Sequence, residues 1–351
     1  MRLRTRSLEG TRDYNGLMEY IRLGDSGLQV APLCLGAMMF GDRTDEAASV
    51  QIIGKAHGAG FNFIDTADVY TKGASERIVG AAIKPHRRDW ILATKCANVM
   101  TKAPYDGGLS RRWVLQACHD SLGRLGTDYI DIYYLHKDDP DTPLAETIGA
   151  IGELLRSGKI RYFGVSNYRG WRIAEIVAEC EAQGVARPVV CQPYYNLLNR
   201  MPEVEVLPAC DYYGLGVAPY SPAARGVLTG KYAPGMPLPE GSRGARGDRR
   251  ITETELREES FVIAQKLREH AQKTGRSLLQ FALAWLWANQ IVSTVIAGPR
   301  TMEQWDEYVG AIGTAWSEED EALVDSLVTP GYASTPNYHD PQYPFFGRVL
   351  G

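Results

Sequence analysis

The sequence predicts an α/β protein that folds as a closed barrel of eight parallel strands, the (β/α)8 barrel. Short apolar runs alternate with longer segments of helical period, and this alternation occurs eight times. An open doubly wound sheet is the alternative, but residues 33–38 lack the Gly-x-Gly-x-x-Gly turn that such nucleotide-binding sheets carry. The 351 residues fit one domain, since a barrel takes about 250 residues and leaves the remainder for additions.

The eight apolar runs are short enough to be strands that are buried on both faces. In chain order, these predicted strands are residues 33–35, 61–64, 91–94, 130–135, 160–165, 189–191, 216–219 and 294–297. Between them lie amphipathic segments with the spacing of helices, which include residues 47–58, 111–124, 144–156, 171–183 and 261–288. The last of these segments is long enough for two helices.

The residues beyond the barrel form recognisable additions. Residues 20–31 alternate around a Ser-Gly turn and predict a β-hairpin that closes the barrel floor. Residues 221–256, rich in glycine, proline and arginine, predict a long mobile loop after the seventh strand. The aromatic tail, residues 330–351, is expected to pack on protein. Residues 1–17 show no pattern and are interpreted as an unstructured extension, which leaves residues 18–351 as one domain.

The composition is that of a globular protein with reduced cysteines. It is 44% apolar with a net charge of −4, so no positive field is available to hold nucleic acid or anionic lipid. No apolar run approaches the roughly 20 residues that span a bilayer, and no secretory leader is evident, which predicts a cytoplasmic location. The cysteines show no metal-ligand spacing, so we expect no metal site and six reduced core thiols: Cys34, Cys96, Cys118, Cys180, Cys191 and Cys210.

A polar residue follows each of several predicted strands. In strand order these residues are Asp65, Lys95, His136, Ser166 with Asn167, Gln192, and Tyr220 with Ser221. Tyr70 lies five positions after Asp65, within a short loop. Because the chemistry of such barrels gathers at the carboxyl ends of the strands, we expect Asp65, Tyr70, Lys95 and His136 to converge at the barrel mouth.

These four ionisable groups can protonate an oxygen atom. A free tyrosine has a pKa of about 10, and the Lys95 ammonium is expected to lower the pKa of Tyr70. Asp65 would keep Lys95 charged, while His136 would orient the substrate oxygen. Each residue alone also has an ordinary explanation, such as a cap, a rim salt bridge, a core histidine or a packed ring. Their joint placement favours carbonyl reduction.

Over residues 20–330 the chain resembles the aldo-keto reductases. The segments that carry the resemblance are YIRLGDSGLQVAPLCLGAMMFG (20–41), FNFIDTADVY (61–70), ILATK (91–95), SLGRLGTDYIDIYYLH (121–136), LLRSGKIRYFGVSN (154–167), QPYYNLLNR (192–200), PYSPAARGVLTGKY (219–232) and VIAGPRTMEQWDE (295–307). The resemblance implies a TIM barrel that binds NADPH without a Gly-x-Gly-x-x-Gly turn. It also implies Tyr70 as the general acid, with Asp65, Lys95 and His136 completing a catalytic tetrad.

The resemblance further implies the cofactor site. It places the nicotinamide carboxamide on Ser166, Asn167 and Gln192 and the nicotinamide ring on Tyr220. It implies that the phosphates and the adenosine half of the cofactor are bound by Ser221, Leu228, Gly230, Lys231, Gly298, Arg300, Gln304 and Glu307. Arg300 favours NADPH over NADH because a guanidinium suits a phosphate. Tyr308 stands where the family often has asparagine near the adenine.

Candidate walls of the substrate pocket come from loops. They are Met38, Met39 and Phe40 after the first strand, and Tyr105 and Trp113 after the third. The aromatic tail is expected either to line this pocket or to pack outside the barrel, and the sequence leaves both open. The arginines of residues 243–250 are interpreted as part of a solvated loop rather than as an anion patch.

The predicted function is reversible reduction of an aldehyde or ketone with NADPH/NADP+. The aromatic mouth favours a bulky or ring-bearing carbonyl, such as an aromatic aldehyde, a keto-sugar or a polycyclic toxin-type ketone. Within the family the chain looks most like bacterial and plant reductases and potassium-channel β subunits, so the alternative is a cofactor-sensing regulatory subunit. A non-catalytic barrel is a third reading, disfavoured by the four intact residues. A homo-oligomer is compatible with all three readings.

Overall fold

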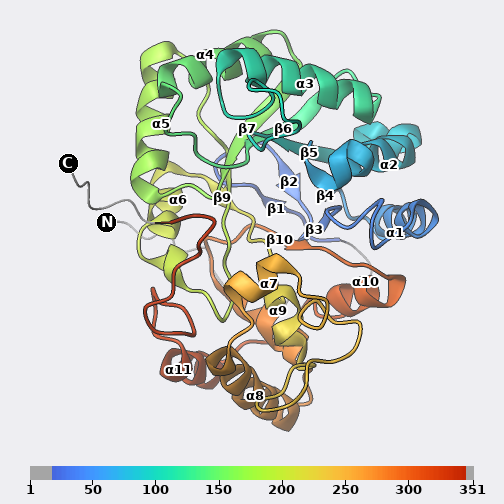
Figure 1. Cartoon of the computed structure of the whole chain (residues 1–351), viewed down its shortest axis with the longest axis vertical. Helices are drawn as coiled ribbons and strands as arrows, with labels where there is room; N and C mark the ends of the chain where they lie inside the picture. The colour runs from blue at the N-terminus through green and yellow to red at the C-terminus, as the bar shows by residue number, and fades with distance from the viewer. Residues whose placement is uncertain (1–17, 345–351) are drawn as a thin grey trace.

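The computed structural model describes residues 18–344, and its centre is a sheet of eight parallel strands (Figure 1). Neighbouring strands follow each other in chain order, except that the last strand lies beside the first. The strands are β3 (Leu33–Gly36), β4 (Phe63–Asp65), β5 (Ile91–Cys96), β6 (Ile130–Leu135), β7 (Ile160–Ser166), β8 (Val190–Gln192), β9 (Gly216–Val217) and β10 (Val295–Ala297).

Hydrogen bonds between the two ends of the sheet close it into a barrel. The Ser293 amide donates to the Val217 carbonyl at 2.8 Å, and the Ile296 amide donates to the Pro219 carbonyl at 3.0 Å. These bonds join the β9 segment to the β10 segment, so the sheet leaves no edge open. The predicted (β/α)8 barrel is confirmed.

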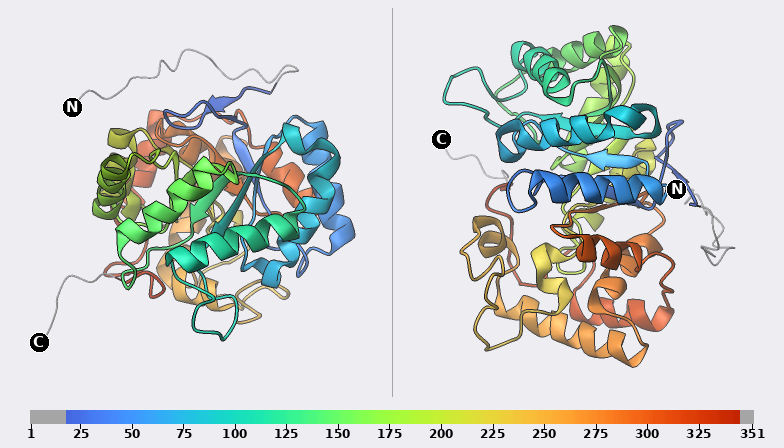
Figure 2. Two further views of the ribbon diagram at one scale, coloured as in Figure 1. Left: turned by 90° about the horizontal axis from the view of Figure 1, so that it is seen from above. Right: turned by 90° about the vertical axis from the view of Figure 1, so that its right-hand side faces the viewer.

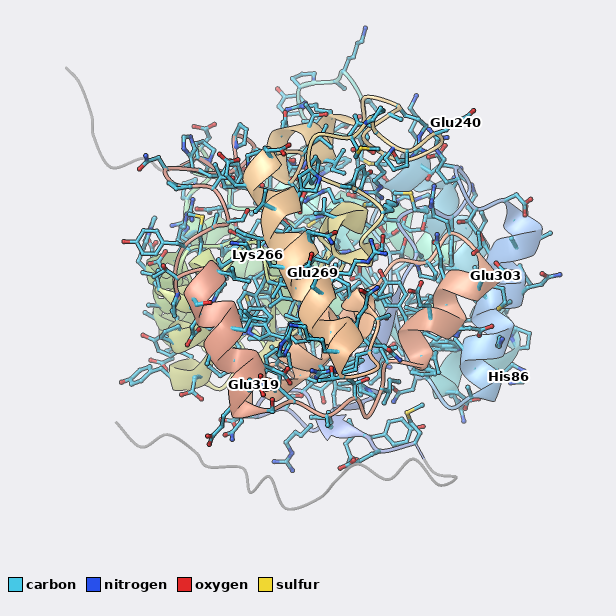
Figure 3. All side chains as sticks on the ribbon, turned by 90° about the horizontal axis from the view of Figure 1, so that it is seen from below. His86, Glu240, Lys266, Glu269, Glu303 and Glu319 are labelled. Atoms are coloured by element: carbon cyan, nitrogen blue, oxygen red, sulfur yellow. The ribbon has the colours of Figure 1, made fainter. Side chains whose placement is uncertain are left out.

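Helices surround the barrel (Figure 2). They are α1 (Glu46–Gly58), α2 (Ala74–Ile83), α3 (Arg111–Leu125), α4 (Leu144–Arg156), α5 (Gly170–Gln183), α6 (Val206–Tyr213), α7 (Arg249–Thr254), α8 (Glu258–Lys273), α9 (Leu278–Ala288), α10 (Met302–Val309) and α11 (Glu318–Leu327). The long segment predicted for two helices is divided between α8 and α9. Helix α8 shows the amphipathic pattern: Phe261 and Leu267 are buried, while Lys266 and Glu269 stand on the surface (Figure 3).

The predicted strands are confirmed, with ends that differ by a residue or two. Strand β4 starts at Phe63 and includes Asp65, and β8 includes Gln192. Both polar residues pair with neighbouring strands, since Asp65 lies opposite Ala93 and Gln192 lies opposite Ser166. A search for apolar runs ends a strand before such a residue, because the residue is polar and its side chain lines the functional site.

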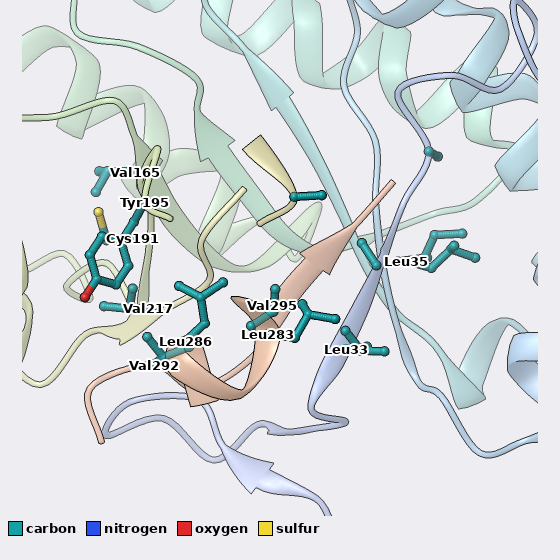
Figure 4. Close-up of a cluster of buried hydrophobic side chains, with 14 of the residues drawn as sticks. Leu33, Leu35, Val165, Cys191, Tyr195, Val217, Leu283, Leu286, Val292 and Val295 are labelled. Atoms are coloured by element: carbon teal, nitrogen blue, oxygen red, sulfur yellow. The ribbon is translucent and has the colours of Figure 1, made fainter. Parts of the chain in front are cut away.

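Two hydrophobic layers hold the barrel. On β6, Tyr133 points outward into the layer beneath the helices, whereas Tyr134 points into the barrel, as strand alternation requires. In the outer layer, Leu283 and Leu286 of α9 pack near Val295 of β10 (Figure 4). All six cysteines are buried and free, which confirms the predicted core thiols.

The predicted floor hairpin is present as β1 (Ile21–Arg22) and β2 (Gln29–Val30). Leu23 and Val30 are fully buried in the interior layer of the barrel. The Asp25 amide donates to the Gly214 carbonyl at 2.8 Å, which ties the hairpin to the segment before β9. The hairpin therefore closes the end of the barrel where the strands begin.

The long loop after β9 is more ordered than the sequence predicts. It contains a 3-10 segment, η4 (Ala224–Thr229), and the short helix α7, whose N-terminus is capped by the Asp248 carboxylate. A buried ion pair between Arg225 and Glu255, 2.8 Å long, joins the two ends of this loop. An ion pair between residues so far apart cannot be predicted from the glycine and proline content of the segment.

The tail packs on protein as expected. Arg250 of α7 binds Asp340 through two hydrogen bonds of 3.0 and 2.6 Å, and the Arg257 guanidinium lies 3.8 Å from the centre of the Tyr338 ring. Residues 1–17, Phe345 and Phe346 lie outside the described residues, so the predictions made for them stay predictions. No helix in residues 18–344 is long and apolar enough to cross a membrane.

Candidate active site

A cavity of about 780 Å³ opens at the carboxyl ends of the strands. Asp65, Ser166 and Gln192 reach it from the ends of β4, β7 and β8. The loop after β9, the start of α10 and the tail form its other walls. The site therefore lies at the end of the barrel that the sequence predicts.

Lys95 is the buried centre of the site. Its ammonium donates to the Asp65 carboxylate at 2.5 Å, to the Thr66 carbonyl at 2.8 Å and to the Tyr70 hydroxyl at 3.2 Å. The Lys95 side chain is fully shielded from solvent, so Asp65 and Tyr70 separate it from the cavity that they line. Three of the four predicted ionisable residues thus form one hydrogen-bonded unit.

Charges within this unit are set by burial and by the ion pair. Burial lowers the pKa of Lys95, but Asp65 and Tyr70 together outweigh it and hold that pKa above its usual value. Burial also raises the pKa of Tyr70, and Lys95 only partly offsets this. Lys95 therefore lowers the pKa of Tyr70 as the sequence predicts, but burial has the larger effect and leaves the pKa above its usual value. Tyr70 is held as a neutral phenol that can donate its proton.

His136 completes the predicted set at the cavity wall. Its ring meets the Tyr70 ring edge to face, with centres 5.8 Å apart, and its backbone carbonyl accepts from the Asn167 amide at 2.9 Å. Burial, followed by the charges of Lys95 and Lys137, keeps the pKa of His136 well below its usual value. The imidazole is therefore neutral and serves as a hydrogen-bonding group rather than as a cation.

The residues predicted for the nicotinamide form a hydrogen-bonded chain along the cavity. The Gln192 amide donates to Asp65 at 3.0 Å, and the Ser166 hydroxyl donates to the Gln192 carbonyl at 2.8 Å. Asn167 donates to the Ser166 hydroxyl and accepts from the Tyr220 hydroxyl. Asn167 has a φ of 61°, a left-handed conformation that asparagine tolerates better than most residues, and this turns it toward its neighbours.

Three basic side chains lie near one another in the cavity lining. They are Lys231, Arg243 and Arg300. Burial lowers the pKa of Lys231, and the like charges of Arg300 and Arg243 lower it further. Cations held together in this way are suited to bind a polyanion.

The other residues predicted for the cofactor divide into two groups. Ser221, Gly298, Gln304 and Glu307 line the cavity. The Gln304 side chain accepts from the Arg300 amide at 2.8 Å, which fixes the start of α10. Leu228 and Gly230 are not among the lining residues, and Leu228 is fully buried in the outer core. Leu228 supports the loop from beneath.

Of the predicted pocket walls, only Met38 and Met39 line the cavity. Phe40 and Trp113 are buried in the outer core, where their apolar area packs beneath helices. Tyr105 is 58% exposed and does not line the cavity. Sequence distance from the strand ends does not show whether a loop side chain turns inward.

Sequence reasoning missed several lining residues. Asn98, Arg225, Arg243 and Arg250 line the cavity, as does Tyr343 of the tail. The interpretation of residues 243–250 as a solvated loop rather than an anion patch is wrong for Arg243 and Arg250, which are only partly exposed and line the cavity. The sequence leaves the tail open as either pocket wall or outer packing, and the structure places Tyr343 in the wall.

Three side chains elsewhere are close enough to share a metal ion, although the sequence predicts no metal site. They are His57, His86 and Asp89, at the end of α1 and before β5. The centres of the His57 and His86 rings lie 4.3 Å apart in a stack, and Nε2 of His57 forms a hydrogen bond with the Asp89 carboxylate at 2.9 Å. These contacts account for the cluster without a metal, and it lies at the barrel end opposite the cavity.

Comparison with known proteins agrees with this geometry. The sequence profile of the Aldo/keto reductase family matches residues 32–329. An uncharacterized oxidoreductase of Bacillus subtilis is 35% identical over 91% of this chain and 98% of its own length. A probable voltage-gated potassium channel subunit beta of Oryza sativa is 36% identical over 84% of this chain and 91% of its own length.

A third relative, the L-glyceraldehyde 3-phosphate reductase of Escherichia coli, is 34% identical over 90% of this chain and 94% of its own length. The family match covers the whole barrel, from β3 to beyond α11, and includes every strand that brings a residue to the cavity. The chain belongs to the aldo/keto reductase family.

Proposed function

We propose that this protein is an NADPH-dependent oxidoreductase that interconverts aldehydes or ketones with alcohols. The observation that carries the proposal is the buried Lys95 ammonium, which bonds Asp65 on one side and the Tyr70 hydroxyl on the other. This unit presents a neutral phenol to a cavity large enough for a cofactor and a substrate. Such a phenol can protonate an oxygen as negative charge develops on it.

The chain's own residues explain the proton side of the reaction. In reduction, Tyr70 gives its proton to the carbonyl oxygen, and the neighbouring Lys95 stabilises the phenolate that forms. Asp65 holds Lys95 charged and in place. Neutral His136, beside Tyr70, is placed to hydrogen-bond the same oxygen and orient the substrate. In alcohol oxidation the same groups act in reverse.

The cavity fits the proposed cofactor. Bound NADPH would supply the hydride that reduces the carbonyl carbon. Ser166, Asn167 and Gln192 offer the donors and acceptors that a carboxamide requires, and Tyr220 offers an aromatic face. The neighbouring cations of Lys231, Arg243 and Arg300 suit phosphates, and this charge supports NADPH over NADH.

The proposed substrate is a bulky or ring-bearing carbonyl. Tyr70 and Tyr343 give the cavity aromatic walls that the cofactor residues leave for the substrate, and Met38 and Met39 add adaptable apolar surface. Aromatic aldehydes, keto-sugars and polycyclic ketones present flat or large faces to such walls. The cytoplasmic location and a homo-oligomeric state stay predictions of the sequence.

A second candidate function is a cofactor-sensing regulatory subunit. It is favoured by the relative in Oryza sativa whose name is that of a potassium channel subunit. In such a protein, tight cofactor binding would matter more than turnover. The mass in solution and the steady turnover rate separate the two functions, because a regulatory subunit would bind NADPH while turning over very slowly.

The first experiment measures NADPH consumption by the purified protein across aromatic aldehydes, keto-sugars and polycyclic ketones. Replacing Tyr70 with phenylalanine is expected to lower turnover by about 100-fold or more, because general-acid catalysis contributes at least that much. The Kd for NADPH should stay within about 3-fold, since the hydroxyl moves a proton and does not hold the cofactor.

The matched control is Tyr105→Phe, which removes the same hydroxyl from an exposed ring outside the cavity lining. An equal loss of turnover in both variants would contradict the role of Tyr70. Tight NADPH binding with no turnover of any carbonyl would instead support the regulatory function.

A further inference from the structure

Asn98 makes a contact that the proposed reaction does not yet use. Its side-chain Nδ2 lies 2.9 Å from Nδ1 of His136. Asn98 follows β5 by two positions and lines the same cavity as Tyr70 and His136. With the amide nitrogen facing the ring in this way, Nδ1 of His136 accepts the hydrogen bond, because an amide NH2 group can only donate.

The loop holds Asn98 in this place at an energetic cost. The preceding residue, Ala97, has a φ of 114°, a strained conformation that an alanine rarely adopts. Two backbone bonds fix it: the Gly108 amide donates to the Ala97 carbonyl, and the His136 amide donates to the Cys96 carbonyl, both at 2.9 Å. The backbone is thus kept in the shape that brings Asn98 to the histidine.

The proton on the ring follows from this contact. A neutral imidazole carries one proton, and if Nδ1 accepts, the proton is on Nε2. Within residues 18–344, no hydrogen bond to protein involves Nε2 of His136, and the ring lines the cavity beside Tyr70. Nε2–H is therefore free to donate to a ligand in the cavity.

We propose that Asn98 is a positioning residue that holds His136 in the Nε2–H tautomer, so that the imidazole donates a hydrogen bond to the oxygen that Tyr70 protonates. The proposal rests on the proposed reductase function. The other groups around His136 do not determine its tautomer: Asn167 binds only its carbonyl, Tyr70 meets the ring at its edge, and Lys95 and Lys137 act through charge.

The test inverts the hydrogen bond without changing the shape of the side chain. In Asn98→Asp the carboxylate can only accept, so it draws the proton of a neutral His136 to Nδ1 and leaves Nε2 without one. Two-bond ¹H–¹⁵N correlation spectra at pH 8 report which ring nitrogen of His136 is protonated, with the signal assigned by its loss in His136→Asn. We expect Nε2–H in the wild type and Nδ1–H in Asn98→Asp. Nδ1–H in the wild type, or the same tautomer in both proteins, would overturn the proposal.

The pH profile gives a second readout that a merely structural role would not change. At pH 8, kcat for carbonyl reduction should fall about 10-fold in Asn98→Asp, because one hydrogen bond to the reacting oxygen is lost. The new carboxylate also favours the imidazolium, which carries protons on both nitrogens. Activity of this variant should therefore recover between pH 8 and pH 6, whereas Asn98→Ala should lose activity equally at both values. A loss in Asn98→Asp that does not depend on pH would contradict the proposal.

The control is Asn289→Asp, which adds the same charge after α9, near the barrel end where the strands begin. It should leave the tautomer and the pH profile unchanged. The spectra need no turnover, so the two hypotheses can fail separately. If the wild type is inactive but has the Nε2–H tautomer, only the reductase function is rejected. If the wild type is active but its His136 tautomer is the same in Asn98→Asp, only the positioning role of Asn98 is rejected.

Discussion

Single residues at this site act through burial. A lysine without solvent contact keeps its charge because a carboxylate lies 2.5 Å away and the Tyr70 hydroxyl also bonds it, and that tyrosine stays neutral because burial outweighs the ammonium. The sequence shows that Asp65, Tyr70 and Lys95 are present but does not show how deeply each is buried. The direction of a pKa shift is therefore a property of the folded site and not of the motif.

Arg300 is predicted to select between the two nicotinamide cofactors. Replacing Arg300 with alanine should raise the Kd for NADPH about 10-fold or more and leave that for NADH within about 2-fold, because only NADPH carries a 2′-phosphate to pair with a guanidinium. Fluorescence titration with both cofactors measures this. Arg43→Ala, which removes an arginine whose side chain is half exposed, is the control. Equal weakening of both cofactors would place the 2′-phosphate elsewhere, with Arg243 as the next residue to test.

Asp68 is predicted to destabilise the fold at neutral and higher pH. It is fully buried, and within residues 18–344 no side chain donates a hydrogen bond to either carboxylate oxygen, so that only the Val69 backbone amide and distant cations favour its charged form. Burial, followed by the charge of Glu76, raises its pKa to about 7. An unfolded aspartate has a pKa of about 3.9, so the folded state binds the extra proton between these values.

The free energy of unfolding should therefore fall as the pH rises from about 4 to about 7. Above pH 7 the contribution of Asp68 to this free energy should no longer change. Asp68→Asn should raise the free energy of unfolding by about 2 kcal/mol at pH 8 and have little effect at pH 4, since an amide costs less to bury than a carboxylate. Chemical denaturation at the two pH values measures this, with the exposed Asp42→Asn as control. A variant that is less stable at pH 8 would contradict the prediction.

At the scale of elements, parallel strands explain how distant residues meet. Asp65, Lys95, Ser166 and Gln192 are the last or next-to-last residues of their strands, so a parallel register places all four at one end of the barrel. The strand pattern alone was therefore enough to predict this part of the site. The loop after β9 and the tail follow no such register, and their contribution depends on ion pairs such as Arg250 with Asp340.

The tail is predicted to shape substrate binding through Asp340. Its two bonds to Arg250, together with the bond from Arg169 to the Tyr343 carbonyl at 2.9 Å, hold Tyr343 in the cavity wall. Asp340→Asn should raise the KM for a bulky carbonyl several-fold and change the Kd for NADPH much less, because Asp340 pairs with Arg250 and not with Lys231, Arg243 or Arg300, the cations proposed to hold the phosphates. Steady-state kinetics measures both effects. Glu181→Gln, which breaks an exposed ion pair with Arg187, should change neither.

At the scale of the whole molecule, the interior of the barrel leaves little room for change. A Cβ atom added to Gly164 of β7 would lie 2.7 Å from the Tyr134 ring and 2.7 Å from the Val190 side chain. Gly164→Ala should therefore lower the free energy of unfolding by about 1 to 3 kcal/mol, as overpacking of cores does. Denaturant titration measures this.

Gly54 of α1 is the matched control, because nothing lies within 4 Å of a Cβ atom added there. Gly54→Ala should raise the free energy of unfolding by about 0.5 to 1 kcal/mol, the gain expected for alanine inside a helix. If the two substitutions had the same effect, the close packing of the barrel interior around Gly164 would be contradicted.

The sequence by itself determined the barrel, the hairpin at its floor and the residues at the strand ends. Apolar periodicity shows which residues form buried strands. Because these strands are parallel, the residues at their carboxyl ends meet at one end of the barrel, and these residues include Asp65, Lys95, His136 and Gln192. Only the tertiary structure decided the pKa of Tyr70, the place of Asn98 and the turn of Tyr343 into the cavity. These depend on burial and on contacts between segments far apart in the chain, and no local pattern encodes such contacts.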